Sequence, residues 1–345
     1  MSRNLQETIL EYLSHHPDST SGKIHAGIGS ASYATVKRTL GRLLKAGLVG
    51  QEGQAKNTRY RLTSHYEILA PIDVEDYFKK EIDERQIKEQ FNFELINTNL
   101  PRLDLFSTHE TDHLTALQKR FRQNVASLTP TEYDKEMERL AIDLSWKSSQ
   151  IEGNTYSLLE TERLLQEKQT AEGKSQADAI MLLNHKEAIT FILEQKDYLN
   201  PLSLRCIEDI HSLLIKDLGV QRNIRQGRVG ISGTNYRPLD NEHQIREALE
   251  NMCWLINGKE NVFEKALLAL LLLSYIQGFS DGNKRTARIV SNAILIAYDD
   301  CPLSFRSVDS IEYKKAMLIF YERNNISAFK KIFINQYEFA VNTYF

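Results

Sequence analysis

The pattern of apolar and polar positions over residues 1–62 predicts three short helices followed by a hairpin. Apolar residues recur at helical spacing over 5–13, and a second short helix is expected over 21–28. A third helix is predicted between a serine cap and Gly47, a residue suited to the end of a helix. Alternating residues over 58–62 then predict a strand that pairs back across a polar turn.

The rest of the chain carries longer helical patterns. A helix is predicted over about 131–154, with Thr131 as its cap and an apolar stripe along one face. A capping box that begins at Ser157 opens the next helix. Residues 263–276 are apolar on most faces, which is typical of a buried core helix. After a loop that contains glycines, another helix is expected to begin near Lys284.

These elements predict a mainly α-helical chain in three parts. Residues 1–63, three helices and a basic hairpin, resemble a winged helix-turn-helix domain. Residues 64–127 are charged and mixed in character and are expected to form a helical linker, with one helix over 74–87. Residues 128–345 hold the remaining helices and form the third part.

Composition narrows the class of protein. Hydrophobic residues make up 41% and charged residues 26%, which is ordinary for a globular chain in water. The first residues lack the apolar core of a signal peptide, and the most apolar run, 266–276, is too short to span a bilayer. We therefore expect a cytoplasmic protein that does not enter a membrane. Three widely spaced cysteines predict neither a disulfide framework nor a zinc site: Cys206, Cys253 and Cys301.

Charge is distributed unevenly along the chain. Residues 1–62 hold nine Lys or Arg and four acidic residues, a balance of +5, whereas the whole chain carries −3. One side of the third predicted helix would fit the major groove of double-stranded DNA, and the hairpin would contact phosphate. The alternative is a solvated face on a small dimerisation domain, in a homodimer. The candidate DNA-binding residues are Lys37, Arg38, Arg42, Lys45, Arg59 and Arg61.

The loop after the buried helix gives the strongest chemical signal. It leads into Lys284, Arg285 and Arg288, which crowd the first turn of the next helix, where unpaired amide N–H groups are already electropositive. These cations are favourable only if an anion lies between them, and the loop glycines let backbone amides approach a phosphate. The pattern therefore predicts a polyphosphate site. The alternative is a surface turn in which Asp281 only caps the helix.

Three motifs share their order with one known family. Residues 277–288, QGFSDGNKRTAR, resemble the Fic signature H-x-F-x-D-G-N-[G/K]-R-x-x-R at every defined position except the first. Residues 148–154, SSQIEGN, are similar to that family's inhibitory motif, [S/T]-x-x-x-E-[G/N], and residues 231–238 to its β-hairpin flap. The resemblance covers roughly residues 100–340. It implies an all-helical core with a short β-hairpin flap, and an enzyme that moves AMP from ATP onto protein hydroxyls.

The resemblance also implies a role for each motif residue. Phe279 would fix the loop in the core, Asp281 would hold Mg²⁺, and Tyr313 would line the adenine pocket. Arg288 would pair with the γ-phosphate of ATP or, at rest, with Glu152, which taken alone is an ordinary exposed glutamate at a helix end. ATP and Mg²⁺ are the implied cofactors, and the acceptor is an unknown target protein or the chain itself. The other implied residues are Gly282, Asn283, Lys284 and Arg285 for the phosphates, Ser148 for inhibition, and Gly230, Ile231, Ser232 and Gly233 for target binding by strand addition.

The first motif position departs from the family pattern. The resemblance places a histidine there as the catalytic general base, and this chain has Gln277. A glutamine amide has no useful basicity, so general-base help worth about 10²–10⁴-fold should be missing. Nucleotide binding without transfer is therefore expected, as in a pseudoenzyme or an inactivated variant. A substitute base could come from His185, His211 or His243, which look more like ordinary helix or loop histidines.

Three functions fit these residues. The first is a Fic-type protein adenylyltransferase that is inhibited by Glu152 and impaired by Gln277. The second is a DNA-binding transcriptional regulator whose Fic domain senses nucleotide without catalysis. The third is the removal of AMP, with Glu152 positioning the water. The related Doc toxins, which transfer phosphate, also have a lysine at the motif position of Lys284. Gly282, in contrast, favours AMP transfer.

Overall fold

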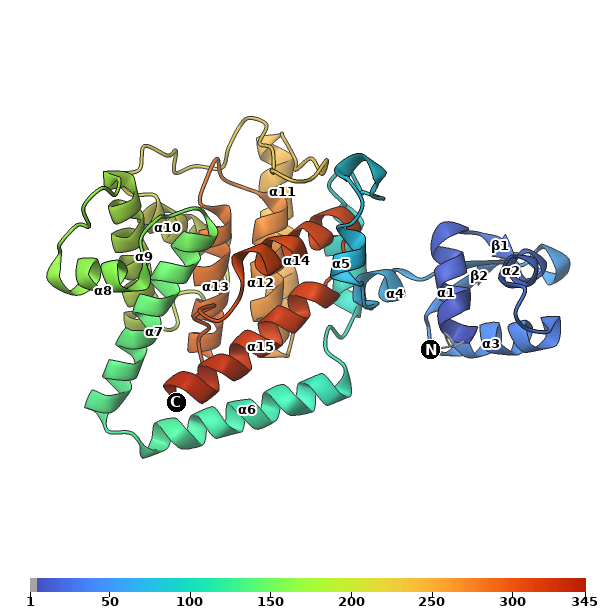
Figure 1. The fold of residues 1–345 in the computed structure, drawn as a ribbon, viewed down its shortest axis with the longest axis horizontal. Coiled ribbons are helices and arrows are strands. Elements are labelled where there is room, and N and C mark those ends of the chain that lie inside the picture. Colours follow the sequence, from blue (N-terminus) through green and yellow to red (C-terminus); the bar gives the residue numbers. More distant parts are fainter. Residues whose placement is uncertain (1–4) are drawn as a thin grey trace. The chain divides into compact units, whose positions relative to one another are not determined.

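The computed structural model describes residues 5–345, and Figure 1 shows its helices and strands. The chain divides into two compact units, one that ends at Pro71 and one from Ile72 to Phe345. The elements of the first unit are α1 (Leu5–His15), β1 (Ser19–Thr20), α2 (Ser21–Ile28), α3 (Tyr33–Lys45), β2 (Val49–Glu52), the turn η1 (Ala55–Asn57), β3 (Arg59–Leu62) and α4 (Ser64–Leu69). Helix α4, which the sequence placed in the linker, therefore lies in the amino-terminal unit.

Helices α1, α2 and α3 and a three-stranded antiparallel sheet form most of the amino-terminal unit, as expected of a winged helix, and α4 follows the sheet. The strand order is β1-β3-β2, so the predicted strand β3 lies in the centre and pairs with the short strand β1, which the sequence pattern did not reveal. The apolar faces of the helices and of the sheet meet in one core, which contains Ile9, Leu13, Ile24, Val36, Leu40, Leu43 and Val49.

Both ends of α3 are set by local chemistry. The Ser32 hydroxyl accepts a hydrogen bond from the backbone N–H of Thr35 at 3.3 Å, which caps the first turn. Gly47 adopts the left-handed conformation, with φ +68°, and the N–H of Leu48 returns to the carbonyl of Leu43 at 3.0 Å. This arrangement is a Schellman cap, and it directs the chain from α3 into β2.

The second unit is almost entirely helical (Figure 1). Its first part contains short pieces: α5 (Val74–Tyr77), η2 (Ile82–Glu84), η3 (Leu95–Asn99) and η4 (Leu100–Arg102). The long helices follow: α6 (Thr108–Ser127), α7 (Pro130–Ile151), α8 (Leu158–Glu167), α9 (Gln176–Glu194), α10 (Leu204–Leu214), α11 (Glu242–Gly258), α12 (Val262–Ile276), α13 (Asn283–Ala297), α14 (Ser310–Arg323) and α15 (Ser327–Tyr344).

The helix pair α12 and α13 forms the centre of this unit. Every residue of α12 from Phe263 to Ile276 is buried, as its apolar sequence predicts, and α13 is buried from Asn283 to Ile296 with the exception of Lys284. Helices α9 and α10 pack on one side of the pair and α11 on the other (Figure 1). The loop between α12 and α13 is therefore held by the most buried part of the molecule.

Two expectations about helix ends are wrong. The helix expected over 74–87 ends at Tyr77, because the Tyr77 hydroxyl and the side chain of Arg85 both turn to the buried carboxylate of Glu322. Tertiary contacts outweigh the local helical pattern there. The cap of α7 is Thr129 rather than Thr131, since Pro130 fits the first helical position.

The expectation of a β-hairpin flap over 231–238 is also wrong, because this segment does not form a hairpin. Among the described residues, 226–236 contain no strand, and the segment makes an irregular turn at Ser232 and Gly233. A single parallel bridge joins Arg237 to Gln90. The flap backbone therefore keeps most of its hydrogen-bonding groups free instead of pairing them within a hairpin.

Within residues 5–345, no helix combines the length and the apolar character that crossing a membrane requires.

Candidate active site

The loop between α12 and α13 is shaped by two side chains. Phe279 is buried and stacks on the ring of His211, with ring centres 3.7 Å apart and planes within 8°. The Asn283 amide closes the loop, because its Oδ1 accepts from the N–H of Phe279 at 2.9 Å and its Nδ2 donates to the Phe279 carbonyl at 2.7 Å. The first amides of α13, after Gly282, lack partners within the helix and form an electropositive end.

Glu152 and Arg288 form an ion pair at the first turns of α13. The backbone of α7 ends at Glu152, and Oε1 of this residue accepts a hydrogen bond from Nη2 of Arg288 at 2.8 Å. Nζ of Lys284 lies 3.4 Å from the other carboxylate oxygen. Two residues that a sequence reading could place only by resemblance are thus brought together across 136 positions.

The two partners of the pair differ in exposure. The Arg288 side chain is fully buried, whereas one-fifth of the Glu152 side chain is exposed. Burial pushes the pKa of the Glu152 carboxyl upward, but the charges of Arg288 and Lys284 outweigh this effect and hold the pKa below its usual range. Glu152 is therefore an anion at neutral pH, in the position where the cations of α13 require one.

Ser148 contacts Arg288 directly, and His185 contacts Ser148. The Ser148 hydroxyl accepts from Nε of Arg288 at 2.8 Å, so its own hydrogen is directed to Nε2 of His185 at 2.7 Å. The Ser148 carbonyl accepts from Nη2 at 3.0 Å, and the Tyr313 hydroxyl lies 3.3 Å from Nη1. Sequence reasoning missed this role of His185, because a single histidine on a helix face gives no signal of a buried contact.

The histidines do not supply a general base within reach of the loop cavities. Burial and the nearby charges of Arg288 and Arg285 hold the pKa of His185 well below its usual range, and its ring nitrogen is engaged by Ser148. His211 lies 2.9 Å from the carbonyl of Asp281 and stacks under the loop. Among the described residues, no histidine lines either of the two cavities at this loop.

Two adjoining cavities open at the loop and share Glu152, Gly230, Gln277 and Lys284. The smaller, of about 160 Å³, is polar and is lined mainly by the loop itself. The larger, of about 370 Å³, is bounded by α14 and the flap, including Ile231, Ser232, Tyr313, Met317, Leu318 and Tyr321. The arrangement provides a cationic compartment suited to phosphates beside a wider compartment with aromatic and aliphatic walls.

Two motif residues have structural partners in addition to lining the polar cavity. Arg285 is buried, donates to the Leu214 carbonyl at 3.2 Å and lies 3.5 Å from the carboxylate of Asp281. Two-thirds of the Asp281 side chain is exposed. Asp281 and Glu152 are the two carboxylates among the described residues that line this cavity, and Asp281 is the one that belongs to the loop. Asp281 is therefore placed to meet a cation that accompanies phosphates.

The Gln277 side chain is held at both ends. Its Nε2 donates to the Ser274 carbonyl at 2.7 Å, and its Oε1 accepts from Nδ2 of Asn283 at 3.1 Å. The backbone of Gln277 ends α12 in the left-handed conformation, with φ +52°. An amide fixed in this way lines both cavities but offers no basic atom to a reacting hydroxyl.

The candidate DNA-binding residues lie on the surface of the amino-terminal unit. All six are exposed: Lys37, Arg38, Arg42 and Lys45 on α3, and Arg59 and Arg61 on β3. The two strand residues also have protein partners, since Arg59 donates to the Asp18 carbonyl at 3.2 Å and Arg61 lies 3.6 Å from Glu52. The face of α3 is therefore the stronger candidate for contact with a polyanion.

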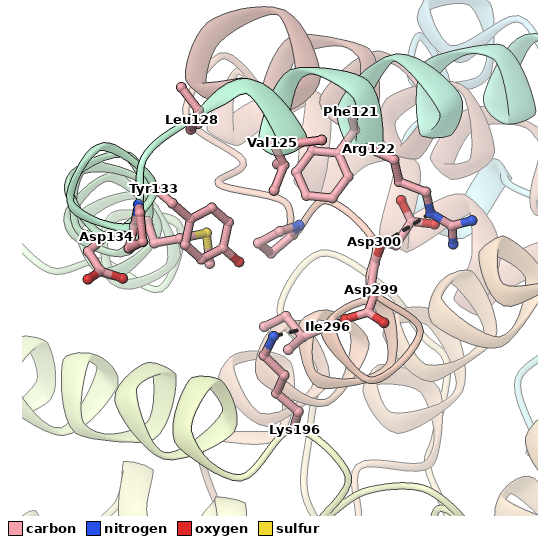
Figure 2. Close-up of a pocket in the computed structure, with 14 residues that line it drawn as sticks. Phe121, Arg122, Val125, Leu128, Tyr133, Asp134, Lys196, Ile296, Asp299 and Asp300 are labelled. Carbon is pink, nitrogen blue, oxygen red and sulfur yellow. Dashed lines mark hydrogen bonds and ion pairs between the residues drawn. The ribbon is translucent and has the colours of Figure 1, made fainter.

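A larger cavity, of about 490 Å³, lies under the turn between α6 and α7 (Figure 2). Its wall includes the rings of Phe121 and Tyr133, with Lys196 and Asp299 at one side of the view. None of its lining residues belongs to the two cavities at the loop.

The fold and the site define a helical domain with a carboxylate at the cationic end of its central helix. Residues 201–295 match the model of the Fic/DOC family, and residues 3–88 match that of the penicillinase repressors. The chain therefore contains a Fic/DOC-family domain, preceded by a winged-helix domain of repressor type. Glu152 and Tyr313 lie outside the residues matched by the Fic/DOC model.

Curated relatives match the chain over less than half of their own length. A protein adenylyltransferase Fic from Nematostella vectensis is 30% identical over 181 residues, which cover 49% of this chain and 40% of the relative. The protein adenylyltransferase fic-1 from Caenorhabditis elegans is 28% identical over 156 residues, 42% of this chain and 30% of the relative.

Solved structures show the same fold at low sequence identity. Fic-1 from C. elegans superposes with a TM-score of 0.58 at 20% identity, covering 68% of this chain and 72% of that chain. A Fic domain containing signaling protein from Bacteroides thetaiotaomicron superposes with a TM-score of 0.57 at 18% identity, covering 67% and 95%.

Proposed function

We propose that this chain is a Fic-type protein adenylyltransferase that Glu152 holds in a resting state and that Gln277 impairs. The observation that carries the proposal is the contact of 2.8 Å between Nη2 of Arg288 and Oε1 of Glu152. A carboxylate there occupies the place that a terminal phosphate of ATP would need. The likeness to adenylyltransferases of two animals supports the same reaction class.

The residues fit ATP with Mg²⁺. The amides at the start of α13, with Lys284 and Arg285, would hold the phosphates in the polar cavity, and the wider cavity would hold the base beside Tyr313. The exposed carboxylate of Asp281 fits Mg²⁺, which usually takes one or two protein carboxylates and completes its shell with phosphates and water. When bound, the ion would neutralise charge on the departing pyrophosphate.

The reaction needs a group that this chain lacks. In AMP transfer, a hydroxyl oxygen of the target attacks the α-phosphorus, the bond between α- and β-phosphates breaks, and pyrophosphate leaves with its electron pair. The proton of the hydroxyl must go to a base at the position of Gln277, whose amide cannot take it. ATP binding with little or no transfer is therefore the expected behaviour of the natural sequence.

The experiment uses the natural chain as acceptor and a repaired chain as enzyme. Gln277→His, alone and with Glu152→Gly, is incubated with the natural chain and ATP labelled at the α-phosphate or, separately, at the γ-phosphate. We expect label from the α-phosphate on the acceptor, more with the double variant. Label from the γ-phosphate alone would show phosphate transfer, and release of AMP from a labelled acceptor would show the reverse reaction. No label from either ATP would overturn the proposal.

A second function, transcriptional regulation through DNA, is favoured by the basic face of α3 and by the match to penicillinase repressors. The test is a gel shift with a 32P-labelled duplex of mixed sequence over a series of salt concentrations. We expect binding that weakens steeply with salt, and a smaller slope when Arg38, Arg42 and Lys45 are all replaced by Gln. No shift at low salt would remove this function, whereas the Fic reaction would be unaffected.

A further inference from the structure

The segment 78–92, here called the strap, makes three hydrogen bonds to the carboxyl-terminal half of the flap. The flap is defined as residues 226–237. Two contacts outside the strap also hold it: the N–H of Arg225, just before the flap, donates to the Gly278 carbonyl at 3.0 Å, and the hydroxyl of buried Tyr236 donates to the Tyr275 carbonyl at 2.9 Å. The strap contacts are those of Arg85 with the Gly233 carbonyl at 3.3 Å, of Asp83 with Nδ2 of Asn235 at 3.1 Å, and of the Glu89 carbonyl with the N–H of Arg237 at 2.7 Å.

Arg85 is itself fixed in position. Its side chain is only 8% exposed, and Nη1 donates both to Oε1 of Glu322 at 3.1 Å and to the Gly233 carbonyl. Its guanidinium lies 4.8 Å from the centre of the Phe78 ring. Glu322 is fully buried on α14 and also accepts a hydrogen bond from Tyr77 at 2.6 Å. Nη1 of Arg85 therefore connects an immobile carboxylate to a carbonyl of the flap, while Nε of the same guanidinium donates to the Lys80 carbonyl at 3.1 Å.

The part of the flap next to the cavities lacks such contacts. Among the described residues, no backbone–backbone hydrogen bond involves residues 226–236. Gly230, Ile231 and Ser232 line the wider cavity with this free backbone. An extended segment of another protein could pair with this backbone edge by strand addition. The contacts at the two ends of the flap determine where the edge lies.

We propose that Arg85 is a positioning residue for the protein acceptor, acting through the Gly233 carbonyl on the edge of the flap. This inference rests on the proposed function, because it concerns the substrate that the flap would align. Arg85 does not line either cavity at the loop, so it would not contact ATP itself.

The decisive variant is Arg85→Lys. Lysine keeps a positive charge beside Glu322, so the buried carboxylate stays paired. Its side chain is shorter and has no second nitrogen to replace Nε of Arg85, which donates to the Lys80 carbonyl at 3.1 Å, so its ammonium should not be held against the Gly233 carbonyl. In the Gln277→His, Glu152→Gly enzyme, with the natural chain as acceptor, we expect the KM for the acceptor to rise about ten-fold, with kcat and the KM for ATP nearly unchanged. Lys79→Gln is the control, since exposed Lys79 lies in the same strap and contacts Asp76.

A second measurement does not depend on catalysis. Amide hydrogen exchange is followed in the natural chain and in its Arg85→Lys variant, with the melting temperature of each. The amides observed are the two in the flap that donate hydrogen bonds, that of Tyr236 to Oγ1 of Thr234 and that of Arg237 to the Glu89 carbonyl. We expect exchange about ten-fold faster in the flap and an unchanged melting temperature. Unchanged exchange, or faster exchange with an unchanged acceptor KM, would overturn the positioning role. A loss of kcat in proportion to stability would show a purely structural residue.

The two measurements separate the possible failures. If the repaired enzyme transfers no AMP to any acceptor, the proposed function fails and substrate positioning fails with it. The exchange result then still shows whether Arg85 fixes the flap. If transfer occurs and Arg85→Lys changes neither acceptor KM nor exchange, only the inference about Arg85 is wrong.

Discussion

Nη2 of Arg288 donates a hydrogen bond to Oε1 of Glu152 at 2.8 Å, from a guanidinium that is fully buried to a carboxylate that is partly exposed. A buried guanidinium without a counter-ion would be costly, so the carboxylate stabilises the chain. Under the proposed function it would also occupy the place of a phosphate. The same contact thus explains why α13 tolerates cations at its amino-terminal end, and under the proposed function nucleotide would have to compete with Glu152 for them.

Removal of Glu152 should weaken the nucleotide-free chain and strengthen nucleotide binding. For Glu152→Ala we expect a loss of about 3 kcal/mol in the free energy of unfolding, because Arg288 keeps only neutral partners. Saturating ATP should restore more stability in the variant than in the natural chain, measured as the shift of melting temperature. Glu167→Ala is the control, since Glu167 pairs with Arg163 on the surface at 3.5 Å. Equal ATP shifts in the natural chain and the variant would contradict this view of Glu152.

His185 should make the stability of the chain fall in mild acid. Burial and the charges of Arg288 and Arg285 keep its pKa well below the ordinary 6.5, so the unfolded chain binds a proton at this residue before the folded chain does. Stability is therefore complete above about pH 6.5 and is lost as the pH falls, by at most about 1.4 kcal/mol per pH unit. His185→Gln should flatten the decline between pH 7 and pH 5 in urea titrations.

The control for His185 is another histidine. His243→Gln changes an exposed side chain in the first turn of α11 and should leave the decline as it is. His211 is also buried, and burial lowers its pKa, so the His185 variant should reduce the slope without abolishing it. A slope identical to that of the natural chain would show that Ser148 does not hold a neutral histidine.

Asp300 should make the stability of the chain fall as the pH rises, the opposite of the effect of His185. Burial raises the pKa of this carboxyl above its usual range, despite hydrogen bonds from Tyr337, Gln118 and the N–H of Cys301. The folded chain therefore binds the proton more readily than the unfolded chain, and stability is lost as the pH rises through the interval above the ordinary value of 3.8. Asp300→Asn should be more stable than the natural chain at pH 7, with a gain that shrinks toward pH 4.

The neighbouring residue offers a matched control for Asp300. Asp299, drawn beside it in Figure 2, is 85% exposed and lies 3.9 Å from Lys196. Asp299→Asn removes the same charge from the rim of the cavity and should change stability little at any pH. If Asp300→Asn were less stable than the natural chain at pH 7, the hydrogen bonds of the carboxylate would outweigh the cost of its burial.

The sequence predicts the fold where local chemistry decides it. Ser32, Gly47 and Ser157 mark helix ends that the structure reproduces, because caps depend on neighbouring residues. The helix expected over 74–87 was wrong for the opposite reason. Its end is fixed by Glu322, which lies 245 positions beyond Tyr77 and is invisible to any local pattern.

In the candidate site too, features carried by local motifs were predicted and contacts between distant residues were not. The cations at the start of α13 and the carboxylate of Glu152 were predicted from motifs, and the structure brings them together. The contacts of His185 with Ser148 and of Arg85 with Gly233 were not predicted. A single histidine or arginine on a charged segment has no periodicity or spacing that would reveal a partner far along the chain.

Gly282 shapes the loop that would hold phosphate under the proposed function, because its backbone adopts the left-handed conformation that favours glycine. Its φ is +82°, and a Cβ at this position would lie 3.2 Å from Cγ2 of Ile215. Gly282→Ala should therefore cost about 1–2 kcal/mol of stability and should shift the amides at the start of α13. We expect weaker ATP binding than in a Glu152→Ala parent without the change, measured by calorimetry. Gly227→Ala is the matched control, since a Cβ there meets open space. Equal ATP affinity in the Gly282 and Gly227 variants would show that this loop does not hold phosphate.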